Sequence, residues 1–275
     1  MTDVTVLAIV LTYNAPASLR ACLRALDGQT RRPESVLVVD NASVTPTEEA
    51  VAGLGLPEGW SRVMRQASNG GPAGGHAAGL RAFLASGSEV AWVMDDDSLP
   101  APDCLQRLLE KGLAGAQPMY VFPSWVQRDG TVTSYPAWCG FVIARAIVET
   151  VGVPMEELFW WAEDTEYLFW RIPGAGYPIT HETAAVVEHR NVRETVHGNP
   201  PWKYYYEARN NVFYHLHVKW DLRRLPRKLG LLVARALLRE RRRRSWRLVM
   251  IARGVADGVL GRLGRRVAVD PSWAA

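Results

Sequence analysis

The first hundred residues alternate between apolar runs of strand length and segments with helical periodicity, and this alternation limits the fold more than any other feature. The runs VTVLAIVLTY, SVLVVDN and EVAWVMD have the composition of strands, and PASLRACLRAL and AGGHAAGLRAFLAS that of helices between them. Strands that follow one another through helices form parallel βαβ units. We therefore predict an α/β fold with a mostly parallel sheet flanked by helices.

Polar residues follow three of these predicted strands. They are Thr12-Tyr13-Asn14, Asp40-Asn41 and Asp95-Asp96-Asp97. In open α/β sheets, ligands bind outside the carboxyl ends of the strands. We expect one crevice to collect the three clusters.

The three adjacent aspartates need a partner, because like charges at short range raise one another's pKa and destabilise the fold. Alternate side chains of a strand share a face, so Asp95 and Asp97 should converge while Asp96 points away. Two convergent carboxylates suit a hard divalent ion such as Mg²⁺ or Mn²⁺. The stretch DDDSLPAPD is also good turn and capping chemistry, but capping would use one or two of the acids, not three.

Length and composition favour one large domain, or one domain with an appendage. The chain has 275 residues, 48% of them hydrophobic, which is enough for a sizeable core. Three cysteines without C-x-x-C spacing predict neither a disulfide framework nor a thiolate zinc site, and they fit a reducing cytosol. The start lacks a basic segment, and no apolar run reaches about 18 residues, so we expect neither a signal peptide nor a transmembrane helix.

Charge is distributed unevenly along the chain. Residues 219–266 hold 16 Lys and Arg against three acids, a net +13, whereas residues 1–218 hold 16 against 24, a net −8. A tail rich in both Arg and Leu is typical of an interfacial helix on anionic lipid, which we favour. A nucleic-acid arm would need only charge. A solvated face would carry more than three acids.

The pattern predicts a catalytic domain over residues 1–218 and a basic helical extension over 219–275. Within the domain, the regular alternation covers about residues 1–117, which the resemblance described below makes the donor half. Strands and helices of less regular order follow in an acceptor half of about 118–218, which includes the aromatic-rich ELFWWAEDTEYLFWRI. The segment PPWKYYYEARNNVFYHLHVKW has helical character after its prolines.

Five motifs together resemble a known family. VLTYN, VVDNAS, NGGPAGGHAAG, WVMDDDSLP and WWAEDTEY occur in the order found in the family-two glycosyltransferases, inverting enzymes of the GT-A fold that use nucleotide-diphospho-sugars. The resemblance covers about residues 4–215. It implies the Rossmann-like GT-A arrangement, with a mixed, mostly parallel sheet.

The resemblance also implies a donor site. Thr12, Tyr13 and Asp40 would contact the nucleoside, Asn69 and the glycines after it would line the site, and Asp95 and Asp97 would hold the metal and diphosphate. Arg209, in YYYEARNNVFY, would either reach the diphosphate or tie the tail to the body. The full set implied for the donor is Thr12, Tyr13, Asn14, Asp40, Asn69, Gly70, Gly71, Gly75, Asp95, Asp96 and Arg209.

By the same resemblance, Asp164 is the catalytic base. Its neighbours Glu163 and Glu166 are alternatives for that role or ligands of an acceptor hydroxyl. Trp138 and Trp161 are the aromatic candidates for acceptor contact, against the alternative of ordinary core packing.

The MDDD and ED-x-EY forms further resemble the galactofuranosyl- and rhamnosyltransferases that build cell-surface glycans. In the galactofuranosyl branch a histidine some two dozen residues past the base completes the metal site. His189, 25 residues after Asp164, stands at that distance, and His181 is its competitor. A lone histidine after an apolar strand is otherwise usually packed.

These inferences predict a metal-dependent inverting glycosyltransferase with Mn²⁺ or Mg²⁺ as cofactor. The expected donor is UDP- or dTDP-linked, with galactofuranose or rhamnose favoured, and the acceptor is a glycan, a lipid-linked glycan or a small natural product. We expect a cytoplasmic protein peripheral to the inner face of the membrane, with no nucleic-acid partner.

Two other classes remain as alternatives. A sugar-phosphate nucleotidyltransferase should show a Gly-rich loop with Arg and Lys after the first strand, where this chain has TYNAPASL. A non-catalytic polyanion-binding protein would use the basic tail alone.

Overall fold

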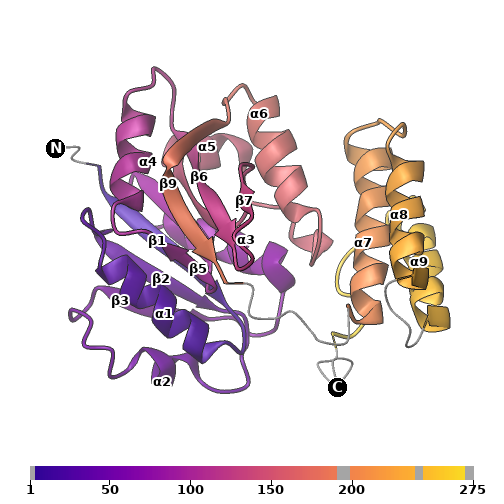
Figure 1. Ribbon diagram of the computed structural model, residues 1–275, viewed down its shortest axis with the longest axis horizontal. Helices are drawn as coiled ribbons and strands as arrows, with labels where there is room; N and C mark the ends of the chain where they lie inside the picture. The colour runs from indigo at the N-terminus through magenta and orange to yellow at the C-terminus, as the bar shows by residue number, and fades with distance from the viewer. Residues whose placement is uncertain (1–3, 191–198, 239–243, 270–275) are drawn as a thin grey trace. The chain divides into compact units, whose positions relative to one another are not determined.

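The computed structural model describes residues 4–190, 199–238 and 244–269 (Figure 1). The chain divides into two compact units. The first is formed by residues 1–154 and 167–192, and the second by residues 155–166 and 193–275. The division predicted at residue 218 falls inside the second unit, because a helix assigned to the acceptor half packs with the C-terminal helices.

One sheet organises the first unit, in the order β3-β2-β1-β4-β8-β6-β9-β5, with β7 paired to β6. The strands are β1 Val6–Thr12, β2 Ser35–Asp40, β3 Ser61–Arg65, β4 Val90–Asp95, β5 Ser98–Pro100, β6 Tyr120–Gln127, β7 Val132–Thr133, β8 Cys139–Ala144 and β9 Thr180–His189. Strands β3, β2, β1 and β4 are parallel, as the alternation predicts. Antiparallel β8 follows at β4, so the sheet is mixed.

Helices cover both faces of this sheet within the first unit (Figure 1). They are α1 Pro16–Asp27, α2 Thr47–Val51, α3 Gly71–Leu84, α4 Cys104–Leu113, α5 Arg145–Val151 and α6 Ile172–Gly174. Val6, Ala8 and Val10 of β1 share a core cluster with α1 and α4, and the alternate residues Leu7, Ile9 and Leu11 share one with α3 and α5. A strand buried on both faces explains the continuous apolar run in the sequence.

Two glycines of α3 allow this helix to pack closely on β1. A Cβ added at Gly75 would lie 2.3 Å from Leu11 Cδ1, and one at Gly79 would lie 2.6 Å from Ile9 Cγ2. The Gly-rich composition of GGPAGGHAAG therefore has a packing reason independent of any ligand.

The second unit is helical. Its elements are the 3₁₀ turn η1 Glu156–Leu158, α7 Pro201–Phe213, the π-helical turn η3 Tyr214–Val218, α8 Leu225–Leu238 and α9 Arg244–Val259. Gly254 and Gly258 of α9 lie against α7, where added Cβ atoms would come within 2.5 Å of backbone oxygens of Tyr205 and Arg209. The helices predicted in the tail are present, and α9 is seated on α7. Within residues 4–190, 199–238 and 244–269, no helix has the length and apolar composition needed to cross a bilayer.

The aromatic segment after residue 158 is the least regular part. It forms a π-helix, η2 Thr165–Arg171, through which the chain passes from the second unit back to the first. Sequence periodicity does not distinguish such a helix from an α-helix, because π-helical turns occur as short, irregular insertions.

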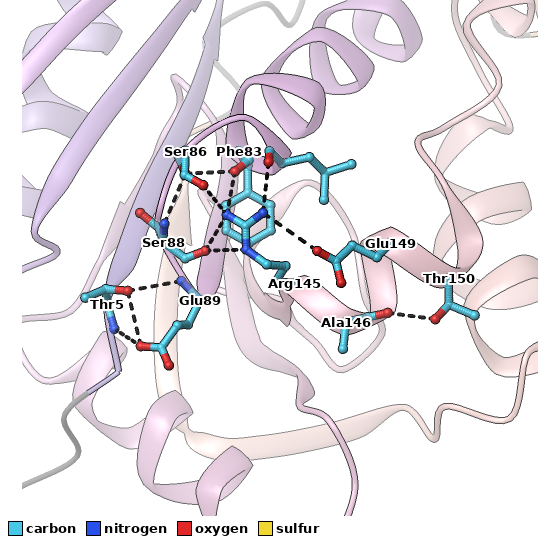
Figure 2. Close-up of polar contacts among 10 residues, drawn as sticks. Thr5, Phe83, Ser86, Ser88, Glu89, Arg145, Ala146, Glu149 and Thr150 are labelled. Atoms are coloured by element: carbon cyan, nitrogen blue, oxygen red, sulfur yellow. Dashed lines mark hydrogen bonds and ion pairs between the residues drawn. The ribbon is translucent and has the colours of Figure 1, made fainter.

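Arg145 fastens the end of α3 to the start of α5, as Figure 2 shows. Its guanidinium donates to the carbonyl oxygens of Phe83, Leu84, Ser86 and Ser88 at 2.6–2.9 Å. Carbonyl groups at a helix C-terminus lack partners within the helix, and this one side chain donates to them; the Phe83 oxygen accepts from Ser86 as well. It also lies over the Phe83 ring, 4.9 Å from the centroid.

Replacing Arg145 by Met should therefore lower the free energy of unfolding by about 2–4 kcal/mol, because several carbonyl groups lose their donor together. Arg107→Met is the control, since Arg107 is exposed and pairs with Asp103 on the surface. It should cost little, because exposed ion pairs contribute little to stability. Denaturant unfolding measures both, and equal losses would contradict the capping role.

Candidate active site

The aspartate run lies at the carboxyl end of β4. The backbone N–H groups of Asp95 and Asp96 donate to the carbonyl oxygens of Trp138 and Leu11. Asp96 is buried, and the Thr12 hydroxyl donates to its Oδ2 at 2.6 Å. Asp96 therefore faces the end of β1, whereas Asp95 and Asp97 contact two histidines.

Strand β9 brings His189 beside Asp97. His189 pairs with Ser98 of β5 in antiparallel register, and its Nε2 lies 3.3 Å from Asp97 Oδ1. Trp125 packs edge-on against the imidazole, with ring centroids 5.4 Å apart. His181, at the other end of β9, contacts Ser124 and stacks on Phe122 instead. Of the two histidines considered, His189 is the one beside the aspartates.

The charge around His189 suits a cation. Burial by itself lowers the pKa of His189, but the hydrogen bond to Asp97 and the charges of Asp97 and Asp95 together raise it. The site thus favours a positive charge on this imidazole, and a metal ion would replace that proton.

The donor types also fit a metal ion. Ligands at right angles around an octahedral ion with bonds of about 2.1 Å lie about 3 Å apart, close to the separation of Asp97 and His189. Carboxylates suit Mg²⁺ and Mn²⁺, and the imidazole favours the transition metal of the two. Among the described residues, however, no three such side chains lie close enough to form one cluster. The predicted set of Asp95, Asp97 and His189 is only partly assembled.

Asp95 contacts His76, a residue that the sequence interpretation missed. His76 is fully buried on α3, and its Nε2 lies 3.0 Å from Asp95 Oδ1. Its ring stacks on Trp138, with centroids 3.9 Å apart and planes 12° apart. The signal was present in the sequence, because a histidine among Ala and Gly on the sheet-facing side of a helix must find a buried partner.

Trp138, predicted at the acceptor, belongs to the core. It is 5% exposed and lies between His76 and Tyr167. Core packing therefore describes Trp138 better than contact with the acceptor does. Its backbone carbonyl nevertheless fixes Asp95 through the hydrogen bond described above.

A pocket of about 460 Å³ opens beyond the carboxyl ends of β1 and β2. Thr12, Asn14 and Ser43 line it, and the first turn of α1 closes one side. Asn14 and Ser43 fix each other, since the Asn14 N–H donates to Ser43 Oγ at 2.9 Å. Residues of α1 and α2 complete the lining, which is more apolar than polar, so the pocket suits a small ligand with an apolar face.

Asp40, also predicted at the nucleoside, lies fully buried next to this pocket. Its Oδ1 accepts the Ser43 N–H at 2.9 Å, and its Oδ2 accepts Arg65 at 2.7 Å. It therefore fixes the loop after β2. Tyr13 lies half-buried between Thr12 and Asn14.

Two asparagines shape the glycine turn before α3. Asn69 Oδ1 accepts the Gly71 N–H at 2.8 Å, and Asn41 Oδ1 accepts the Gly70 N–H at 3.0 Å. Gly71 has φ +70°, a conformation that favours glycine. Gly75, predicted with them, faces Leu11 of β1, so packing is the role that the structure gives it.

Asp164 lies in the second unit, half-buried after an irregular loop. Burial raises the pKa of its carboxyl, although the Thr165 N–H and hydroxyl and the charge of Lys228 act in the opposite direction. Glu163 and Glu166 on either side are buried, and Trp161 is 40% exposed. A carboxylate with a raised pKa is a better proton acceptor than an ordinary aspartate.

Arg209 is not available to a diphosphate. It is fully buried, and its guanidinium donates to the Asn210 side chain and to the carbonyl oxygens of Glu157, Leu158 and Gly264. The prediction that Arg209 binds the donor diphosphate is therefore wrong. Its alternative describes the residue better, because Arg209 links separate segments of the chain. The guanidinium geometry that suits phosphate oxygens suits clustered carbonyl oxygens as well.

The sequence profile described as "Glycosyl transferase family 2" matches residues 7–174, more than half of the chain. The chain belongs to this family. Galactofuranosyltransferase GlfT1 of Mycolicibacterium smegmatis is 36% identical over 96 residues, which are 35% of this chain and 31% of that protein. The chain thus matches under a third of the length of this relative.

Solved structures show the same fold. A mannosyltransferase from Pyrobaculum calidifontis, in complex with GDP-Man and Mn²⁺, superposes with a TM-score of 0.63 at 20% identity, covering 98% of this chain and 77% of that one. GalNAc-T7 with UDP, GalNAc and Mn²⁺ gives 0.62 at 15% identity, covering 83% and 55%. The predicted GT-A arrangement with a helical C-terminal region is confirmed.

The raised pKa of Asp164 predicts how stability depends on pH. An acid with a raised folded-state pKa stabilises the fold below its unfolded pKa of about 3.9, and this contribution is lost as the pH rises through the folded value. Asp164→Asn should therefore have a Tm at pH 7 equal to or above that of the wild type, with the difference shrinking toward pH 4.

Asp103→Asn is the control of opposite sign. The hydrogen bond from Arg107 lowers the pKa of exposed Asp103, so this variant should lose a little stability at pH 7. Thermal unfolding between pH 4 and 8 measures both. A marked loss of Tm at pH 7 in Asp164→Asn would show that this carboxylate has a structural role.

Proposed function

We propose that this chain transfers a sugar, with inversion, from a nucleoside diphosphate to an acceptor hydroxyl. The observation that supports this most is the pair Asp97–His189, at 3.3 Å, beside Asp95 at the carboxyl edge of a family 2 sheet. Near the same edge, between α1 and α2, lies a pocket of about 460 Å³, large enough for a nucleoside. Both features lie in the first unit.

Asp95, Asp97 and His189 would hold Mn²⁺ or Mg²⁺ together with the donor diphosphate. The ion supplies stabilisation of the negative charge that develops on the leaving diphosphate. Thr12 and Asn14 would orient the nucleoside, with Tyr13 and Asp40 beside them. Asn69, Gly70 and Gly71 would line the donor site before α3, in a turn whose Gly70 and Gly71 N–H groups are held by Asn41 and Asn69. Relatives of the same fold solved with Mn²⁺ support a divalent ion.

Asp164 is the proposed base. Its carboxylate takes the proton of the acceptor hydroxyl while that oxygen bonds to the anomeric carbon. The bond from that carbon to the diphosphate oxygen breaks at the same time, and its electron pair stays on the diphosphate. One displacement inverts the anomeric centre, with no sugar–enzyme intermediate.

The favoured sugar is galactofuranose, with rhamnose as the runner-up, carried on UDP or dTDP. The similarity to a mycolicibacterial galactofuranosyltransferase supports the first, although it covers 35% of this chain. Trp161, Glu163 and Glu166, which flank Asp164, are the proposed acceptor contacts. The acceptor would be a glycan, free, lipid-linked or on a small natural product.

The test is a donor panel. The protein is incubated with UDP-galactofuranose, dTDP-rhamnose, UDP-galactose and GDP-mannose, with Mn²⁺ or with EDTA, and nucleoside diphosphate release is measured. We expect nucleoside diphosphate to be released from one of the donors, and only when the metal ion is present. NMR should show that the product has the inverted configuration. Release from none of them, or equal release in EDTA, would contradict the proposal.

A matched pair of histidine variants tests the metal site. With UDP present, Mn²⁺ should raise the Tm of the wild type and of His181→Ala alike. His189→Ala should need at least about tenfold more Mn²⁺ for the same shift, because it loses an imidazole ligand. Equal Mn²⁺ dependence in the two variants would remove His189 from the site.

We also infer that the C-terminal helices contact an anionic membrane surface. On α8, Leu231 and Leu238 are 61% and 78% exposed, seven residues apart and thus on one face, in a segment rich in Arg. Trp220 and Trp246 are 80% and 45% exposed in the same unit. Part of the basic run, residues 239–243, lies outside the described residues.

Leu231→Gln with Leu238→Gln tests this surface without disturbing the packing of α9 on α7. Sedimentation with vesicles of phosphatidylglycerol and phosphatidylcholine should fall markedly in the double variant. The wild type should not pellet with phosphatidylcholine alone, since about 1 kcal/mol per basic residue comes from anionic lipid. Unchanged sedimentation of the double variant would refute this face as the contact.

A further inference from the structure

The loop that precedes Asp164 has a strained backbone. Phe159, Trp161 and Ala162 have φ values of 62°, 75° and 67°, in the left-handed region that residues with a Cβ rarely adopt. Three such residues within four positions persist only where the surroundings hold them. The residue that holds them is therefore of interest for the position of Asp164, two residues further on.

Asn210 of α7 makes the contacts that can do this. It is fully buried, and its Nδ2 lies 2.8, 2.8 and 2.7 Å from the carbonyl oxygens of Leu158, Trp160 and Trp161. An amide group has only two hydrogens, so the three carbonyl oxygens share them. These three oxygens converge on one nitrogen because the backbone between them takes the left-handed turn.

Arg209 fixes which way the amide of Asn210 faces. Its Nε donates to Asn210 Oδ1 at 2.7 Å, and because arginine can only donate, the amide nitrogen must point to the loop. The same guanidinium donates to the carbonyl oxygen of Leu158 at 2.8 Å and lies over the rings of Tyr205 and Tyr206. Gly258 of the neighbouring helix α9 packs on the Arg209 carbonyl oxygen, so α9 supports this part of α7.

We propose that Asn210 is a positioning residue: it fixes the conformation of residues 158–162 and, through them, the place of the Asp164 carboxylate. This inference rests on the proposed role of Asp164 as the base. Asn210 does not touch the reacting atoms. Its effect on transfer arises because small displacements of a catalytic group lower the rate strongly.

Asn210→Asp is the test variant, because it keeps the shape but replaces two N–H donors by a carboxylate oxygen facing three carbonyl oxygens. Tyr205→Phe is the matched control. It removes one buried hydrogen bond of the same helix, from the Tyr205 hydroxyl to Asp257 at 2.7 Å, and keeps the ring that lies beside the Arg209 guanidinium as well as every contact of Asn210 with the loop. Both variants are assayed well below their own Tm.

In the transfer assay, Asn210→Asp should lower kcat by at least about tenfold while the donor KM stays within about twofold. Tyr205→Phe should leave both constants within about twofold even where its Tm falls as much. A kcat near the wild-type value in Asn210→Asp, or an equal fall in Tyr205→Phe, would overturn the positioning role. If Asn210→Asp does not fold, Arg209→Lys replaces it, since lysine lacks the planar fork that reaches Asn210, Leu158 and Gly264 together. The same split between kcat and KM is expected.

A second readout is independent of activity. Chymotrypsin cuts after aromatic residues, and Phe159, Trp160 and Trp161 lie in the loop. Native-state cleavage there, followed by mass spectrometry, should be at least about tenfold faster in Asn210→Asp than in Tyr205→Phe, because cleavage follows the open population. Equal cleavage rates would show that Asn210 does not hold the loop. A wild type that transfers no sugar, combined with fast cleavage of Asn210→Asp, would reject the proposed function while retaining the clamp.

Discussion

The repulsion among three neighbouring carboxylates is the constraint on which the candidate site depends. The fold meets it by giving each acid a different partner: Thr12 donates to Asp96, His76 contacts Asp95, and His189 contacts Asp97. These partners come from β1, α3 and β9, so the run is held only when strands far apart in sequence pair correctly. The acids lie at the sheet's carboxyl edge because β4 ends there.

The second unit solves a different problem, which is to hold an acid that directly follows an irregular loop. Three left-handed residues lie between the 3₁₀ turn η1 and the helical residues that begin at Glu163, and Asp164 follows them. Support comes from the side chains of Arg209 and Asn210 on α7, and α7 is in turn packed on α9 through two glycines. The C-terminal helices therefore have a structural role in this unit in addition to any contact with lipid. Asp257, an acid within the basic tail, belongs to this support, since it accepts the Tyr205 hydroxyl.

The sequence predicts the regular part of the fold well, because strands buried on both faces appear as continuous apolar runs and their helices as amphipathic segments. The resemblance to the galactofuranosyl branch points to His189 rather than His181, and strand pairing puts His189 opposite Ser98, beside Asp97, while its role as a metal ligand stays a prediction. Prediction from the sequence fails where a residue type suits two different partners. Arg209 suits a phosphate and a group of carbonyl oxygens equally, and only burial decides between them. Trp138 suits a sugar face and a histidine ring equally. His76 was overlooked because its neighbours are small and apolar, and Asn210 because no spacing rule connects it to a loop some fifty residues earlier.

The central claim is that the aspartate edge binds a divalent ion together with a nucleoside diphosphate. Electron paramagnetic resonance of aqueous Mn²⁺ tests it directly, because the signal of the free ion falls as the ion is bound. With wild-type protein and UDP, the signal of free Mn²⁺ should fall until one ion is bound per chain. With Asp97→Asn at the same concentrations, the signal should stay nearly unchanged. Equal loss of signal in the variant, or no loss in the wild type with UDP, would contradict the account.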